Sequence, residues 1–130
     1  MPPGPDPTLV LAAWLVGAVS VVTGLSVLSR VVRIQRERHV AAWEADGRPA
    51  APWTLPWRIP PAGDPSVPRN PFDLLRTNLL LMRWLLRTPP WARDDAQARR
   101  LLWMLRALQL VALAAGAVFL VQVLPSIRRR

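Results

Sequence analysis

The chain of 130 residues lacks cysteine, tyrosine and lysine, and it has a single histidine, His39. Without cysteine there is no disulfide, no thiolate metal site and no cysteine nucleophile, and the redox compartment is left open. With one histidine and no thiol, we expect no transition metal and no other cofactor. Because lysine is absent, all 17 basic residues are arginine, which stays charged and binds phosphate groups through a planar fork.

The hydrophobic residues, 52% of the chain, gather in two blocks near the ends, and most of the charge lies between them. This distribution predicts an all-α integral membrane protein with a two-span transmembrane helical hairpin. An amphipathic interfacial helix and a Pro-rich linker are expected between the spans.

The first predicted span covers residues 8–29, after a Pro-rich tail at residues 1–7. Its 22 uncharged residues give a helix of about 33 Å, enough for a hydrocarbon core of about 30 Å. A cleaved signal peptide is the alternative. We favour a retained span because no arginine precedes the apolar run, whereas Arg30 and Arg33 follow it immediately.

The second predicted span covers residues 107–124, which is near the lower length limit for crossing a membrane. Residues 101–105 would lengthen it if the Arg106 side chain reaches the headgroups. Pro125 is expected to stop the helix, which leaves a basic tail at residues 125–130.

Small residues at helical spacing predict a face on each span where helices approach closely, since hydrophobicity supplies no attraction between helices in lipid. The predicted helix-packing residues are Ala13, Gly17, Ser20 and Gly24 in the first span and Ala112 and Gly116 in the second. The alternative is that glycine and alanine are simply common in bacterial spans, and we favour the packing face.

Residues 30–47 are predicted to continue the first helix out of the membrane, with Gly47 just past its end. A linker at residues 48–70 holds seven prolines and two tryptophans. We expect the rings of Trp53 and Trp57 to lie at the level of the lipid headgroups. The alternative is that this segment is a proline-aromatic ligand for a binding domain.

An amphipathic helix is predicted at residues 71–87, with Asn70 as its N-cap. Arg76, Arg83 and Arg87 share one side of it. The apolar residues on the broad opposite side are Leu74, Leu75, Leu79, Leu81, Met82, Leu85 and Leu86. This pattern fits a helix lying in the membrane surface and equally a helix packed on the two extensions. An Arg-rich helix at residues 91–106, capped by Asp94 or Asp95, then leads into the second span.

The positive-inside rule places the arginine-rich region between the spans in the cytoplasm. The predicted lipid-headgroup contacts are Arg30, Arg33, Arg76, Arg83, Arg87, Arg99, Arg100 and Arg106. The expected location is therefore the bacterial cytoplasmic (inner) membrane, with lipids as partners and no nucleic acid. The three terminal arginines oppose this topology, and a re-entrant second segment is the alternative.

No catalytic residues are expected. His39 lies too far beyond the span to ligate a pigment within the bilayer, so a solvated position is predicted. Asp94 and Asp95 would point about 100° apart on a helix and would not converge as an acid-base pair. We therefore expect no enzyme and no small-molecule substrate.

The order of parts is similar to universal stress protein B and its relatives, which are small bacterial two-span membrane proteins. The residues that carry this resemblance are Arg38-His39 through Trp43 to Pro49, then 72–87, then Asp94 to Arg106. The resemblance implies a stand-alone, stress-associated membrane protein without catalytic residues. The small-residue faces, the tryptophans near the predicted membrane surfaces and the absence of a recognisable site favour a different role, a structural or accessory subunit packed with other transmembrane subunits of a larger complex of respiratory or photosynthetic type.

Overall fold

The computed structural model describes residues 4–49 and 71–127, without the side chains of Leu74 and Ser126. Most of the Pro- and Trp-rich linker, the Asn70 cap and the last three arginines lie outside the described residues.

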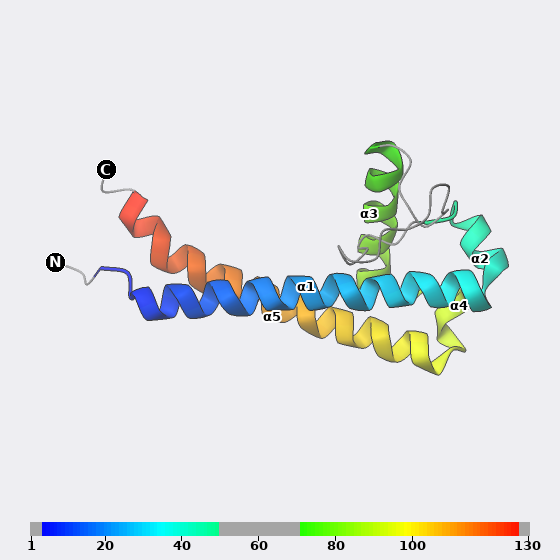
Figure 1. Ribbon diagram of the computed structural model, residues 1–130, viewed down its shortest axis with the longest axis horizontal. Helices are drawn as coiled ribbons and strands as arrows, with labels where there is room; N and C mark the ends of the chain where they lie inside the picture. Colours follow the sequence, from blue (N-terminus) through cyan, green and yellow to red (C-terminus); the bar gives the residue numbers. More distant parts are fainter. Residues whose placement is uncertain (1–3, 50–70, 128–130) are drawn as a thin grey trace, which may run out of the picture. The chain divides into compact units, whose positions relative to one another are not determined.

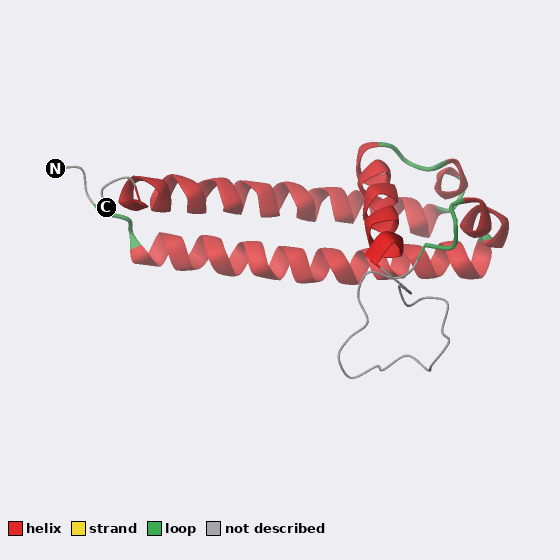
Figure 2. Cartoon of the chain, turned by 90° about the horizontal axis from the view of Figure 1, so that it is seen from above, coloured by secondary structure: helices red, strands yellow, loops and turns green. Residues whose placement is uncertain are grey.

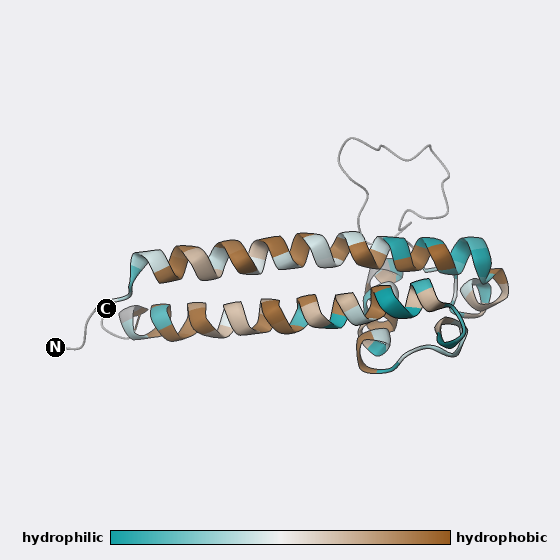
Figure 3. Cartoon of the chain, turned by 90° about the horizontal axis from the view of Figure 1, so that it is seen from below, coloured by the Kyte–Doolittle hydropathy of each residue, from teal (hydrophilic) through white to brown (hydrophobic). Residues whose placement is uncertain are grey.

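The described part of the chain is entirely helical, as predicted, and contains no strand (Figure 1). Its helices are α1 (Pro7–Arg38), α2 (Val40–Ala45), α3 (Pro71–Leu86), α4 (Pro90–Arg93) and α5 (Ala96–Ile127). Helices α1 and α5 are both long and apolar enough to cross a membrane. In the view of Figure 3, hydrophobic residues follow much of the length of both helices, and hydrophilic residues gather at the end of α1 and the start of α5.

The start of α1 is fixed by Asp6 and Pro7. The Asp6 side chain accepts hydrogen bonds from the backbone N–H groups of Thr8, at 2.9 Å, and Leu9, at 3.4 Å. Pro7 occupies the first helical position, where a missing N–H costs nothing. The helix therefore begins one residue before the predicted span.

The prediction of one uninterrupted helix through residues 30–47 is wrong, because the chain bends at His39. His39 has φ −129° and ψ 52°, outside the helical region, and it separates α1 from α2. Helical backbone hydrogen bonds continue on both sides of the bend, since the His39 N–H donates to the Gln35 carbonyl and the Trp43 N–H donates to the His39 carbonyl. The bend brings His39 to partners that a straight helix would not meet.

Helix α2 ends in a Schellman motif. Gly47 adopts φ +83°, and its N–H donates to the Glu44 carbonyl at 3.0 Å. The Arg48 N–H donates to the Trp43 carbonyl at 2.8 Å. Gly47 is thus the left-handed residue just past a helix, the position that its sequence context predicts.

Pro125 does not stop α5, contrary to the prediction, because the helix continues to Ile127. Proline removes one backbone hydrogen bond and crowds the preceding turn. Only two further residues follow it in α5, so little helix depends on the lost bond.

The chain divides into two compact units. The apolar unit comprises residues 4–24 and 107–127 of the described chain, and the arginine-rich unit comprises residues 25–49 and 71–106. The buried hydrophobic residues of the arginine-rich unit are Val27, Leu28, Val31, Val32, Ile34, Trp43, Leu81, Trp84, Ala92, Ala98, Leu101, Leu102 and Leu105. Leu101, Leu102 and Leu105 thus belong to a packed core and do not extend an exposed span.

Within the arginine-rich unit, α3 runs across the direction of α1 and α5 (Figure 2). Thr77, Leu81 and Trp84 are buried on its inner side. Its outer side exposes an apolar stripe at spacings of three and four residues, formed by Phe72, Leu75, Leu79, Met82 and Leu86. Leu81, which the sequence placed on the apolar side opposite the arginines, therefore packs inward, whereas Leu75, Leu79, Met82 and Leu86 of the same predicted side are exposed. Helix α3 combines both predicted characters, a packed side and an amphipathic outer surface.

Candidate functional site

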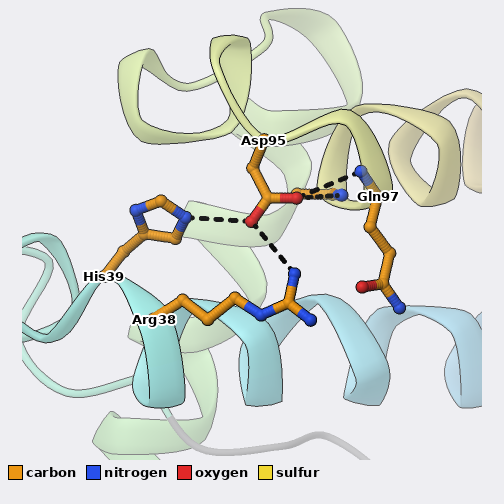
Figure 4. A network of polar contacts seen from close by, with 5 residues as sticks. Arg38, His39, Asp95 and Gln97 are labelled. Carbon is orange, nitrogen blue, oxygen red and sulfur yellow. Dashed lines mark hydrogen bonds and ion pairs between the residues drawn. The ribbon is translucent and has the colours of Figure 1, made fainter.

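A polar junction joins the end of α1 to the start of α5. It consists of Arg38, His39 and Asp95, which Figure 4 shows, together with Trp91. The His39 Nε2 lies 3.1 Å from Asp95 Oδ2, and an Arg38 guanidinium nitrogen lies 3.6 Å from the same oxygen. The Asp95 side chain is only 9% exposed, so the Arg38 guanidinium and the His39 ring both act on a nearly buried carboxylate.

Asp95 is also the N-cap of α5. Its Oδ1 accepts hydrogen bonds from the backbone N–H groups of Gln97 and Ala98, both at 3.0 Å. The Ala98 bond, followed by the His39 bond, holds the pKa of Asp95 below its ordinary value, although burial acts in the opposite direction. Of the two predicted capping residues, Asp95 therefore has this role, and Asp94 is exposed at the end of α4.

Aromatic contacts surround the junction. The His39 ring lies 5.2 Å from the Trp91 ring, and Trp91 meets Trp84 edge to face at 5.5 Å. The His39 side chain is 26% exposed. The prediction that His39 is a solvated helix residue is therefore wrong, because the bend in the backbone turns its ring toward Asp95 and Trp91.

A second polar pair ties α1 to the end of α2. Gln35 is fully buried, and its Nε2 donates to Asp46 Oδ2 at 2.6 Å. Gln35 Oε1 and Trp91 Nε1 are buried without a hydrogen-bond partner among the described residues. Buried polar groups without a partner are costly in a packed interior.

Arg106 has a structural role that differs from the predicted lipid contact. Its guanidinium donates to the carbonyls of Trp84, at 3.1 Å, and Leu85, at 2.9 Å, and to the Thr88 hydroxyl at 2.9 Å. The last carbonyls of a helix lack partners within the helix and carry partial negative charge. Arg106 therefore caps the C-terminal end of α3 and is unavailable for lengthening the second span.

A cavity of about 410 Å³ lies beside the junction, between α2, α3 and α4. Its lining residues are Ala42, Ala45, Asp46, Leu80, Arg83, Trp84, Arg87, Thr88, Pro89, Pro90, Trp91 and Arg93. Three of these are arginines and one is an acid, so the cavity is electropositive. Its volume is within the range of small-molecule sites.

The remaining predicted headgroup arginines are exposed in the arginine-rich unit: Arg30, Arg33, Arg76, Arg83, Arg87, Arg99 and Arg100. Arg83 and Arg87 line the cavity, whereas the Arg76 guanidinium lies over Gly47, close to where a Cβ would project. Arg99 donates to the Arg93 carbonyl at 2.7 Å. The exposed arginines therefore form several small groups.

The predicted small-residue face meets α5 within the apolar unit. Ala13, Ser20 and Gly24 are buried. A Cβ on Gly17 would lie 3.7 Å from the Ala115 Cβ. Ala112 is half-buried, but Gly116 is exposed, with no described atom within 4 Å of its Cβ position. Ala115 therefore replaces Gly116 as the partner of Gly17, because adjacent helix positions point about 100° apart.

Among the described residues, no group of three histidine, cysteine or acidic side chains is close enough to hold a metal ion. The junction offers one carboxylate held by a guanidinium, an imidazole ring and two backbone amides. Such a carboxylate is a fixed acceptor, suited to tying helices together.

Comparisons with protein-family models, curated proteins and solved structures find no match to this chain. The resemblance to universal stress protein B thus stays a prediction from the order of the parts.

Sequence reasoning missed two features of the site for which a signal existed. Asp6-Pro7 has the same acid-proline pattern as a helix start that Asn70-Pro71 offers. Arg38-His39 and Asp94-Asp95 stand at opposite ends of the region between the predicted spans, at similar distances from each span. An antiparallel pair of helices would bring these opposite charges together.

Proposed function

We propose that the chain is a non-enzymatic, two-span protein of the bacterial cytoplasmic membrane that packs as an accessory subunit against a larger assembly of respiratory or photosynthetic type. The observation that carries this proposal is the lack of cover on the two apolar helices. Only 17% of the apolar window of α1 and 6% of that of α5 are buried within the chain. Such surfaces require lipid or protein around them.

Two surfaces support an intersubunit role over a solitary one. Gly116 is exposed on α5, away from Ala115, and small residues permit the close approach of another helix in lipid. The apolar stripe of α3 lies beside its arginine side, which suits a helix at the membrane surface. In this proposal the arginine-rich unit faces the cytoplasm.

The test is purification of the full chain from its native membrane in mild detergent. We expect fixed partners in constant stoichiometry. Gly116→Leu should reduce their recovery because it blocks close approach, whereas Val121→Leu on an exposed position should not. A monomer without partners, combined with stress sensitivity of a deletion strain, would favour the stand-alone role of the universal stress protein B type.

The topology has a separate test. If both helices cross the membrane and the arginine-rich region is cytoplasmic, a reporter fused to the C-terminus should give the signal of a location outside the cytoplasm. A cytoplasmic signal there would contradict the two-span hairpin and favour a re-entrant second segment.

A further inference from the structure

The cavity beside the polar junction contains three arginines that nothing in the described chain neutralises. Arg83 comes from the last turn of α3, Arg87 directly follows that helix and Arg93 comes from α4, and all three line the same space. No salt bridge or side-chain hydrogen bond connects any of the three guanidinium groups to another described residue. Their donors are therefore available to a ligand.

The charge arrangement favours an anion. Arg83 and Arg87 are four residues apart at the C-terminal end of α3, where the Arg87 N–H donates to the Arg83 carbonyl, and like charges at this spacing repel each other. Asp46 is the single acid in the lining, and its Oδ2 already accepts the hydrogen bond from Gln35. A bound anion would relieve the repulsion among the three arginines.

The walls of the cavity indicate more than a simple ion. Trp84 and Trp91, in edge-to-face contact, form an apolar wall together with Leu80 and two alanines. The three arginines line the same cavity. A volume of about 410 Å³ exceeds what one phosphate needs. Arginine binds phosphate oxygens bidentately, so the chemistry matches a phosphate group attached to an apolar or glycerol-like body.

We propose that this cavity is a binding site for a phosphate group, held by Arg83, Arg87 and Arg93 against the Trp84–Trp91 wall. The phosphate can come from an anionic lipid headgroup or from a soluble phosphate compound. The site does not depend on the accessory-subunit role, since every residue belongs to this chain.

The test uses the purified full chain in uncharged detergent and isothermal titration calorimetry with two probes, dihexanoylphosphatidylglycerol and inorganic phosphate. The cavity variant is Arg83→Gln, Arg87→Gln and Arg93→Gln. The control variant, Arg30→Gln, Arg33→Gln and Arg100→Gln, removes the same charge from exposed positions outside the cavity. Because all six side chains are exposed, both variants should retain the helical circular dichroism of the parent chain.

We expect saturable binding with one site per chain, weakened about tenfold or more in the cavity variant and less than about twofold in the control. Replacing the three arginines by lysine should give an intermediate affinity, because charge is kept and the fork is lost. Tighter binding of the lipid probe identifies a headgroup as the source, and equal binding of inorganic phosphate identifies a free phosphate group. No saturable binding of either probe, or equal weakening in the two glutamine variants, would overturn the proposal. Since the assay needs no partner subunit, its result is independent of the purification test above.

Discussion

The apolar unit and the arginine-rich unit are built from the same two long helices, α1 and α5, yet they are stabilised differently. In the apolar unit the only buried hydrophobic residues are Ala13 and Ala115. The arginine-rich unit adds α2, α3 and α4, and it buries tryptophans, leucines and valines around a polar junction. Within one pair of helices, therefore, one part has a core of its own and the other part depends on its surroundings.

Charge divides the two units in the same way. Every described arginine lies in the arginine-rich unit, and none lies within residues 4–24 or 107–127. A helix satisfies its backbone hydrogen bonds internally, so its backbone can lie in lipid. Charged side chains placed in lipid carry a large free-energy cost. The arginine-rich unit also contains the cavity, the junction and both buried groups without partners.

The largest expected difference between the units concerns tryptophan. Trp84 is 2% exposed at the centre of the arginine-rich unit, so Trp84→Ala should lower the free energy of unfolding by about 3–5 kcal/mol. Trp14 in the apolar unit is 58% exposed, and Trp14→Ala should change it by less than about 0.5 kcal/mol. Urea unfolding in detergent, followed by near-ultraviolet circular dichroism, measures both. Equal effects would mean that the two units share one core.

The next prediction concerns pH and the polar junction. The pKa of Asp95 is lower in the folded chain than its ordinary value, so its charge stabilises the fold above that ordinary value. This contribution is lost as the pH falls through the folded pKa. Asp95→Asn should cost about 1–2 kcal/mol at neutral pH, and its difference from the parent chain should begin to shrink as the pH falls below about 4 and vanish only below the folded pKa.

The matched control for Asp95 is its neighbour. Asp94 is exposed, and Asp94→Asn should leave the unfolding free energy within about 0.5 kcal/mol of the parent chain across the same pH range. Thermal unfolding at a series of pH values measures both variants. A cost for Asp95→Asn that is independent of pH would show that its capping geometry matters and its charge does not.

The sequence predicted those features of the two units that depend on local pattern. Apolar length predicted α1 and α5, and a glycine after a helical run predicted the end of α2 at Gly47, because such signals need only neighbouring residues. The same reasoning anticipated that Asp94 or Asp95 caps a helix. Each of these predictions depends only on residues within or next to a single helix.

Features that join distant segments could not be predicted in this way. The partners of His39 and Arg106 come from helices far along the chain, and their side chains suit solvent or headgroups equally well when viewed alone. Leu81 differs from its exposed neighbours only by the side of α3 that packs inward. Which side of an amphipathic helix packs is set by tertiary contacts, which override the local pattern.

An effect of similar size to that of Asp95→Asn is expected at Gly47 in the arginine-rich unit. Its φ of +83° disfavours any residue with a Cβ, so Gly47→Ala should cost about 1–2 kcal/mol. The Arg76 guanidinium 2.5 Å from the new Cβ adds little, because the end of a long side chain can move. Urea unfolding measures the change, and an unchanged midpoint would mean that the Schellman motif does not stabilise this unit.

The smallest effects are expected at the glycines of the apolar unit, and there the sign should reverse. A Cβ at Gly17 would make ordinary contact with Ala115, and one at Gly116 would meet no described atom. Since alanine favours a helix over glycine by about 0.5–1 kcal/mol, Gly17→Ala and Gly116→Ala should be neutral or slightly stabilising in the isolated chain. Thermal unfolding in detergent checks this. If Gly116→Ala leaves the isolated chain intact but weakens co-purification with partners, the surface of the apolar unit is completed by another helix. If it destabilises the isolated chain, Gly116 packs within the chain itself, and the contrast between the two units fails at this position.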